Sequence, residues 1–194
     1  MNCLVRDCVR IISGDAKGTR LKTPKGMKTR PTADRVKESV FGILGGKIED
    51  SVVLDLFSGS GALGLEALSR GAAIATLVDK SAESVKIIKE NAELTKMDSV
   101  AKICREDVFQ AVKRLANDKA VFDLIFCDPP YNLGLAPKAV QALDACDLLS
   151  ERGVLVLEHS RHENLPGELK RIAAYRSEFY GETVVSFFRK QEGI

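Results

Sequence analysis

Residues 52–72 read VVLDLFSGSGALGLEALSRGA and contain three patterns that together indicate the fold class. The apolar run at residues 52–56 has the length of a buried strand and gives way to Ser58-Gly59-Ser60-Gly61, which is typical of a loop. Residues 62–70 then have a helical pattern, and Gly71 ends it. A strand, a glycine-rich loop and a helix in this order predict the first unit of a parallel α/β sheet.

Strand-like and helix-like segments alternate through the next hundred residues. Strands are expected over 74–78, 101–104, 122–127 and 153–157, and helices over 81–94, 108–115 and 137–149. Repeated units of this kind require a parallel sheet with helices on both faces. Residues 172–180 and 183–189 flank Gly181-Glu182 and predict a hairpin. The expected fold is therefore a mainly parallel seven-stranded sheet with an antiparallel C-terminal hairpin.

A basic segment precedes this domain. Residues 1–40 carry ten Lys and Arg against four Asp and Glu, whereas the rest of the chain carries nineteen against twenty-three. Residues 34–44 predict a helix ended by Gly45-Gly46, and residues 10–30 predict a short hairpin or arm. We therefore divide the chain into a basic arm, 1–33, and a domain, 34–194. The charge favours a polyanion bound at this edge, but a solvated terminus explains it equally well.

The composition excludes several classes of protein. Hydrophobic residues make up 45% of the 194 positions, which is enough for a full core, and no run of eighteen apolar residues predicts a membrane span. The N-terminus does not resemble a signal peptide. Five cysteines without a C-x-x-C pair indicate reduced thiols in a cytoplasmic protein, and the two histidines complete no metal site.

Acidic residues fall at the ends of the first four expected strands: Asp55, Asp79, Asp107 and Asp128. The carboxyl ends of parallel strands lie along one edge of a sheet, where ligands bind. We therefore expect these four carboxylates to line one crevice. Helix capping is the alternative for any single one of them, and for Asp107 it is equally probable.

The loop at residues 59–64 matches G-x-G-x-x-G, which by itself is a weak indication of a dinucleotide site. A pyrophosphate would face Asp55 and Asp128 with no lysine in the loop, and two like charges roughly 5 Å apart repel by about 3 kcal/mol. A ligand with a nucleoside at one end and positive charge at the other fits better. S-adenosylmethionine has both.

Each residue of the loop and of the first three strand ends then has an expected role. Gly59 and Gly61 allow close approach of the cofactor's methionine portion, and Asp55 attracts its ammonium group. Asp79 accepts the ribose hydroxyls. Asp107 accepts the adenine amino group, and Val108 packs on the purine or donates its backbone N–H to it.

Residues 128–131, Asp-Pro-Pro-Tyr, suit methyl transfer to an exocyclic amine of a base. Such an amine is a poor nucleophile, because its lone pair is delocalised into the ring, and acceptors for both of its N–H groups orient it. Asp128 provides one acceptor, and the Pro129 carbonyl, held rigidly by Pro130, provides another. Tyr131 can stack on the base. A plain Pro-Pro turn with a buried tyrosine is the less probable alternative.

The segments VVLDLFSGSGALGLEALSRGA and CDPPY together resemble the class I, Rossmann-like methyltransferases that act on amines. With RIISGDAKGTRLKTP and RPTADRVKESVFGIL upstream, residues 10–189 resemble the RsmD family. This resemblance implies transfer of a methyl group from S-adenosylmethionine to the N2 amine of a guanine in bacterial 16S ribosomal RNA. Ser13, where a glycine is expected, and the long leader at residues 1–9 depart from the family pattern.

The resemblance implies three sets of site residues. Its catalytic motif falls on Asp128, Pro129, Pro130 and Tyr131. Its cofactor site falls on Asp55, Phe57, Gly59, Gly61, Gly64, Asp79, Lys80, Asp107 and Val108. Its RNA-contacting edge falls on Arg10, Lys17, Arg20, Lys22, Lys25, Lys28, Arg30, Thr32 and Arg35.

Three alternatives stay open at this level. An adenine-N6 methylase acting on DNA or RNA would share Asp-Pro-Pro-Tyr, although a DNA methylase commonly carries a target-recognition domain for which this chain is short. A nicotinamide-dependent oxidoreductase is disfavoured by the acidic crevice. A non-catalytic RNA-binding protein would have no need of residues 128–131. The expected partner is small-subunit ribosomal RNA or the assembling small subunit, and the protein is expected to be a monomer.

Overall fold

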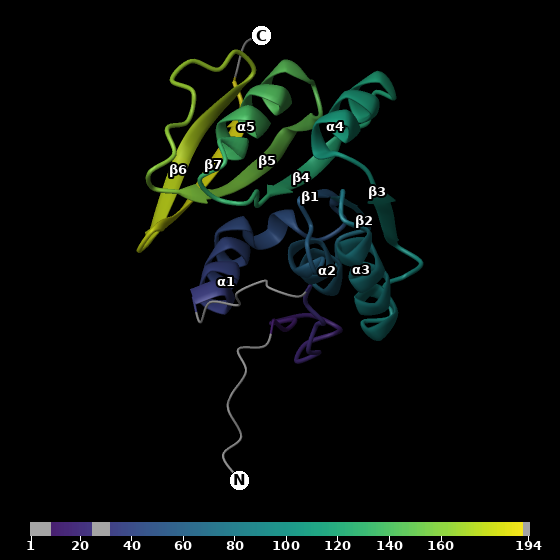
Figure 1. The fold of residues 1–194 in the computed structure, drawn as a ribbon. Coiled ribbons are helices and arrows are strands. Elements are labelled where there is room, and N and C mark those ends of the chain that lie inside the picture. The colour runs from purple at the N-terminus through teal and green to yellow at the C-terminus, as the bar shows by residue number, and fades with distance from the viewer. Residues whose placement is uncertain (1–8, 25–31, 192–194) are drawn as a thin grey trace.

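The computed structural model describes residues 9–24 and 32–191. These residues form one mixed sheet with helices on both faces (Figure 1). The sheet has seven strands in the order β3-β2-β1-β4-β5-β7-β6. The strands are β1 Val52–Leu56, β2 Ile74–Asp79, β3 Ala101–Arg105, β4 Phe122–Cys127, β5 Leu149–Ser160, β6 Ile172–Tyr180 and β7 Thr183–Lys190. The helices are α1 Thr32–Leu44, α2 Ala62–Ser69, α3 Ala82–Leu94, α4 Val108–Asn117 and α5 Leu135–Ala145, and a 3-10 turn covers Gly45–Lys47.

The first five strands pair in parallel, and β7 runs antiparallel between β5 and β6. This arrangement confirms the predicted fold class. The strand order reverses at β1, which lies between β2 and β4. A parallel sheet opens a crevice beyond the carboxyl ends of its strands at such a reversal. The topology therefore places the ligand site at the ends of β1, β2 and β4.

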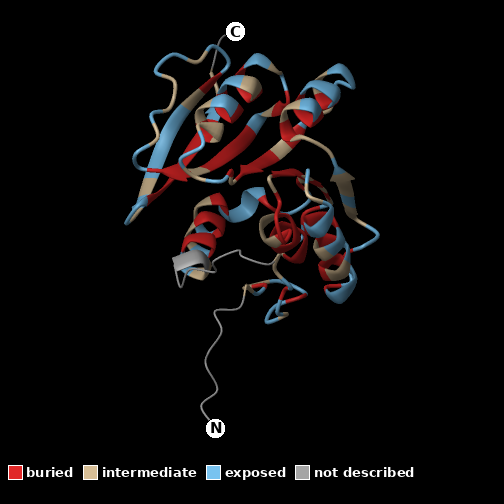
Figure 2. Cartoon of the chain, viewed as in Figure 1, coloured by how far each residue is buried: buried red, intermediate tan, exposed pale blue. Residues whose placement is uncertain are grey.

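The two faces of the sheet carry separate cores. Strand residues alternate between faces, so that Phe126 and Val156 pack with α1, α2 and α3, whereas Cys127 and Leu157 pack with α4 and α5. Figure 2 shows that the buried side of each helix faces the sheet, while β6 at the edge is mostly exposed. The first face matters most for the site, because the odd-numbered Val53 and Leu77 and the even-numbered Phe126 and Val156 all point to it.

The described part of the basic arm, residues 9–24, packs against the domain. Ile11, Ala16 and Leu21 are buried in the same core as α1, α2 and α3. The backbone N–H groups of Ala16 and Lys22 donate to Ser69 Oγ and Asn91 Oδ1, at 3.0 and 2.9 Å. The arm is thus fixed to α2 and α3 by apolar burial and hydrogen bonds. The domain boundary at residue 33 stays a prediction.

A buried ion cluster strengthens this attachment. The side chain of Glu66 on α2 is fully buried, and its carboxylate accepts from the backbone N–H groups of Ile12 and Ser13 at 2.8 and 3.0 Å. The same carboxylate pairs with Lys37 at 3.1 Å and with Arg70 at 2.7 Å. Burial lowers the pKa of Lys37, and the charge of Glu66 opposes that shift. A buried carboxylate needs such partners, and here half of them come from the arm.

Three predicted elements differ from the structure. The helix expected over 137–149 covers Leu135–Ala145, because Cys146 turns to an extended backbone and Leu149 pairs with Phe122 to lengthen β5. The strand expected over 153–157 consequently covers Leu149–Ser160. Within residues 9–24 the hairpin expected in the arm is reduced to one antiparallel bridge between Arg10 and Arg20, because the intervening residues form turns that bind α2.

Candidate active site

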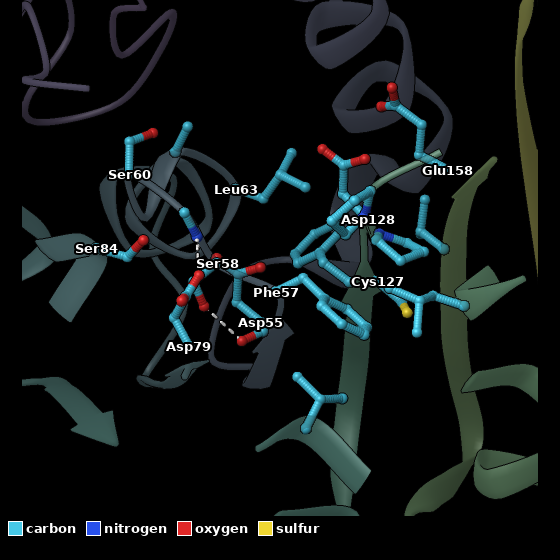
Figure 3. A pocket seen from close by; sticks show the side chains of 18 of the residues that line it. Asp55, Phe57, Ser58, Ser60, Leu63, Asp79, Ser84, Cys127, Asp128 and Glu158 are labelled. Carbon is cyan, nitrogen blue, oxygen red and sulfur yellow. Dashed lines mark hydrogen bonds between the residues drawn. The ribbon is translucent and has the colours of Figure 1, made fainter. Parts of the chain in front are cut away.

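A cavity of about 720 Å³ opens at the carboxyl ends of β1, β2 and β4 (Figure 3). This volume lies in the range typical of small-molecule sites. Most of the predicted cofactor and catalytic residues line it: Asp55, Phe57, Gly59, Asp79, Lys80, Asp107, Val108, Asp128, Pro129, Pro130 and Tyr131. The four acids at four strand ends therefore do converge on one crevice, as the sequence indicated.

Gly61 and Gly64 are absent from the lining and instead support the loop from behind. Gly61 precedes α2 with a φ of 79°, a conformation that favours glycine. A Cβ at Gly64 would lie 2.9 Å from Leu77 Cδ2 and 3.1 Å from Asp55 Oδ2. Both glycines therefore let α2 pack closely on β1 and β2, which holds the loop at the mouth of the cavity.

Asp55, at the end of β1, is only 2% exposed. Its Oδ2 accepts the backbone N–H of Gly64 at 3.0 Å. Burial raises the pKa of Asp55 to about 7, the charge of Asp79 adds to the shift, and the Gly64 hydrogen bond opposes it. A cation in the cavity would favour the ionised form, so Asp55 is suited to a ligand that carries positive charge.

Asp79, at the end of β2, bridges two loops. Its Oδ2 accepts the N–H of Gly59 at 2.9 Å, and its Oδ1 accepts the N–H of Ser81 at 2.8 Å. The side chain is only partly buried and lines the cavity. Each carboxylate oxygen has a second lone pair, so Asp79 can accept hydroxyl groups of a ligand while it holds the glycine loop.

Asp107 caps the N-terminus of α4, which was the alternative to ligand binding in the sequence analysis. Its Oδ1 accepts the N–H groups of Phe109 and Gln110 at 3.0 and 3.3 Å. Asp107 also lines the cavity, so capping and ligand binding are compatible. Beside it the rings of Phe57 and Phe109 pack edge to face, with centroids 6.4 Å apart, and form an apolar wall.

The Asp-Pro-Pro-Tyr segment follows β4 directly and lines the other half of the cavity. Pro129 is buried, whereas Asp128 and Tyr131 are partly exposed. The Tyr131 hydroxyl donates to the Glu158 carboxylate and lies 3.0 Å from Thr183 Oγ1. Burial raises the pKa of Tyr131, and the charge of Glu158 raises it further, so the phenol keeps its proton.

The sequence analysis missed two acidic residues of the lining, Asp34 on α1 and Glu158. Glu158 is the one at an expected strand end. It lies on β5 and comes directly after residue 157, where a strand end was expected. The rule that found the other acids, a carboxylate at a strand end, would therefore have found it as well. Lining residues from α1 and β7 carried no comparable signal, because only the fold brings these elements to the cavity: Val36, Lys37, Val40, Thr183 and Val185.

The predicted RNA-contacting residues are only partly described. Arg10 pairs with Asp34 at 3.0 Å and Lys22 pairs with Glu90 at 2.7 Å, both at the surface, and the other described side chains, Lys17, Arg20 and Arg35, are exposed. Lys25, Lys28 and Arg30 lie outside the described residues, and Thr32 begins α1 but its side chain is not described. At the two ends of the described arm, Val9 and Pro24 line the cavity.

Within residues 9–24 and 32–191, no group of three or more His, Cys, Asp or Glu is arranged to hold a metal ion. No helix in that part of the chain is long and apolar enough to cross a membrane.

Known proteins are similar to this chain over nearly its whole length. The family model described as "Conserved hypothetical protein 95" matches residues 9–189. The chain is 37% identical over 183 residues to "Putative rRNA methyltransferase YlbH" of Bacillus subtilis strain 168, covering 94% of this chain and 100% of that protein. It is 33% identical over 184 residues to "Ribosomal RNA small subunit methyltransferase D" of Escherichia coli K12, covering 94% and 90%.

Solved structures of other proteins have a fold similar to that of this chain. "Putative methyltransferase yhhF from Escherichia coli" has a TM-score of 0.82 at 29% identity and covers 95% of this chain and 98% of that one. SMU.776, a structure described as "a putative methyltransferase complexed with SAH", has a TM-score of 0.65 at 18% identity and covers 81% and 48%. The second likeness supports the class I methyltransferase fold alone.

Proposed function

The chain belongs to the RsmD family, and from this premise we propose that it transfers a methyl group from S-adenosylmethionine to the exocyclic N2 amine of a guanine in small-subunit ribosomal RNA. The observation that carries the proposal is that Asp55 and Asp79, beside the glycine loop, line the same cavity as the Asp-Pro-Pro-Tyr segment (Figure 3). We call the part of the cavity around Asp55, Asp79 and Asp107 the first half; it has the groups that a cationic nucleoside needs. The part around residues 128–131 and Glu158 is the second half, and it has acceptors for an amine.

S-adenosylmethionine fits the first half of the cavity on the chemistry of its donors. Asp55 is buried with a pKa raised to about 7, so an ammonium group beside it would compensate the negative charge that burial disfavours. Asp79 would accept ribose hydroxyls, and Asp107 would accept the adenine amino group, with Val108 and the phenyl ring of Phe57 against the purine. When bound, the cofactor supplies an activated methyl group on a sulfonium.

The second half of the cavity acts on the target base. Asp128 and the Pro129 carbonyl accept the two N–H groups of the amine, which turns its lone pair toward the cofactor side of the cavity. Pro129 and Pro130 fix φ at successive residues, so these acceptors lose little entropy on binding. Tyr131 offers its ring for stacking. The rate enhancement then comes mainly from alignment, without a covalent enzyme intermediate.

The proposal extends to the partner and the compartment. RNA would reach the cavity along the arm, whose exposed Lys17 and Arg20 attract phosphates. The partner would be small-subunit ribosomal RNA or the assembling subunit, which places the protein in the cytoplasm. Cys104, Cys127 and Cys146 carry free thiols, which is typical of that compartment. We propose that the protein acts as a monomer.

Transfer of a labelled methyl group tests the proposal. The protein is incubated with methyl-labelled cofactor and with small-subunit RNA, or small subunits, from cells that lack it. We expect label in the RNA, and N2-methylguanosine at one position when the digested RNA is analysed by mass spectrometry. Label on adenine would favour the N6 alternative, and absence of transfer to any RNA would refute the proposed activity. DNA of matched length serves as the control substrate.

A further inference from the structure

Glu158 occupies a position equivalent to Asp128 on the neighbouring strand. β4 and β5 pair in parallel with Cys127 opposite Leu157. Asp128 follows Cys127, and Glu158 follows Leu157. Both residues follow the alternation that brings Phe126 and Val156 to the α1 face of the sheet. Both line the cavity, and Figure 3 shows their carboxylates on the same side of it, away from Asp55 and Asp79.

The surroundings of Glu158 hold its carboxylate in a defined place. The Tyr131 hydroxyl donates to Glu158 Oε1 and is itself 3.0 Å from Thr183 Oγ1. Glu158 is paired with Val185 of β7 in the sheet, and its neighbour Leu157 is paired with Cys127 of β4, so its backbone is held in place. The buried side chains of Phe126, Val156 and Val185 line the same part of the cavity and provide an apolar floor. A positioned acceptor above an apolar floor is suited to reading the edge of a flat base.

The Watson–Crick edges of the bases differ beside the exocyclic amine. In guanine the amine-bearing carbon lies between N1, which carries a hydrogen on the Watson–Crick edge, and N3, an acceptor away from that edge. The amine and N1 together present three N–H groups. In adenine the amine is next to N1, and in cytosine it is next to N3; both ring atoms are acceptors. A carboxylate facing that ring atom therefore accepts a hydrogen bond from guanine and repels the lone pair of the other two bases.

We propose that Glu158 is the residue that selects guanine, by accepting its N1–H while Asp128 and the Pro129 carbonyl accept the N2 amine. This inference rests on the proposed guanine-N2 transfer and adds the reason for its base specificity. Each carboxylate oxygen has more than one lone pair, so Glu158 accepts from Tyr131 and from the base together. Tyr131 then has two roles, with its ring against the base and its hydroxyl on the specificity residue.

The test uses a base that keeps the amine but lacks the neighbouring hydrogen. In 2-aminopurine the amine is attached at the same carbon as in guanine, but N1 is an acceptor. Synthetic RNA spanning the mapped target is made with guanine or with 2-aminopurine at that position, and kcat/KM is measured for both. A site built to bind an N–H group discriminates strongly against an analogue that lacks it, so we expect the wild type to prefer guanine by about 100-fold or more.

Glu158→Gln supplies the decisive comparison, because it keeps the shape of the side chain and adds an amide donor. We expect the preference for guanine to fall by about 10-fold or more, with the loss on guanine and a smaller loss, or a gain, on 2-aminopurine. The ratio between variants cancels the intrinsic difference in reactivity of the two amines. Glu151→Gln makes the same change at an exposed position of the same strand, outside the cavity lining, and is the matched control, so its preference should stay within about 3-fold of the wild type.

The outcomes separate this inference from the proposed function. Wild-type protein that methylates no guanine refutes the proposed function itself. Wild-type protein that methylates guanine and 2-aminopurine within 3-fold of each other overturns the role of Glu158, whether or not any variant folds. The same holds if Glu158→Gln leaves the preference unchanged, or if the control Glu151→Gln lowers it equally. Cofactor affinity and thermal unfolding of each variant show that it is folded.

Discussion

The two halves of the cavity hold their carboxylates in different ways. In the first half, Asp55, Asp79 and Asp107 each accept hydrogen bonds from backbone N–H groups of the loops around them. In the second half, Glu158 accepts from the hydroxyl of Tyr131, and Asp128 begins a segment stiffened by two prolines. The first half therefore combines support of the loops with ligand binding in the same side chains. In the second half, side-chain contacts and proline rigidity take the place of those backbone hydrogen bonds, so we expect methyl transfer there to be separable from cofactor binding.

Asp128→Ala tests that separation with the largest expected effect. Loss of the acceptor leaves one N–H of the target amine unpaired in the transition state, so we expect kcat to fall by about 1,000-fold. Cofactor affinity should stay within a few-fold, because the cofactor residues come from other strands. Single-turnover transfer and equilibrium binding of the cofactor measure the two quantities.

Asp128→Asn should cause a smaller loss of kcat than Asp128→Ala. It keeps one oxygen acceptor, so its activity should lie between those of the wild type and Asp128→Ala. A variant with weak cofactor binding but surviving transfer would reverse the comparison, because Asp128 would then belong to the half that binds the cofactor.

Asp79→Ala should show the opposite behaviour. It removes the partner of the Gly59 and Ser81 N–H groups and an acceptor for ribose hydroxyls, so we expect cofactor affinity to fall by about 100-fold and the unfolding temperature to fall with it. Calorimetric titration and thermal unfolding provide the readouts. Asp98→Ala, which removes an exposed acid after α3, is the matched control and should change neither. If Asp79→Ala lowers transfer but leaves binding and stability intact, the two halves do not differ as described.

Local patterns decided what the sequence could predict. The fold followed from apolar runs that alternate with glycine-ended helical patterns, and Asp55, Asp79, Asp107 and Asp128 followed from their places at the ends of those runs. The helix expected to reach residue 149 ended at Ala145 because Leu149 joins the sheet beside Phe122, a pairing that no local pattern encodes. Glu158 was missed although its strand was expected, and Thr183 reaches the cavity only because β7 inserts between β5 and β6.

The pH dependence of cofactor affinity tests the buried acid of the first half. The pKa of Asp55 is raised to about 7 by burial, so the protein without cofactor holds a proton there at lower pH. A cationic cofactor requires the ionised form, so affinity should rise by about 10-fold per pH unit up to pH 7 and level off above it. Isothermal titration across pH 5–8.5 measures the slope and the proton released on binding.

Asp55→Asn should flatten that slope and also change stability. The folded pKa lies above the value of 3.8 for the free side chain, so the folded wild type binds more protons between pH 4 and pH 7. Its free energy of unfolding should therefore fall as pH rises through that window, by on the order of 4 kcal/mol, and stay level above it. The asparagine variant should lack this component. An unchanged pH slope of binding in the variant would assign the titration to another group.

The arm provides the smallest expected effect and tests from which side RNA reaches the second half. Residues 9–24 pack on α2 and α3, which carry the first half, and their two ends line the cavity. Lys17→Glu with Arg20→Glu should weaken RNA binding by about 10-fold at low salt and reduce the slope of log K against log salt by about 2, because two phosphate contacts are lost. Lys113→Glu with Lys138→Glu makes the same charge change on α4 and α5, across the sheet from the arm (Figure 1). If both pairs weaken binding equally, attraction by the overall charge is sufficient, and the arm has no special place on the path of the RNA. If only the arm pair does so while cofactor affinity is unchanged, the RNA passes over the half that holds the cofactor before its base enters the half that holds the amine.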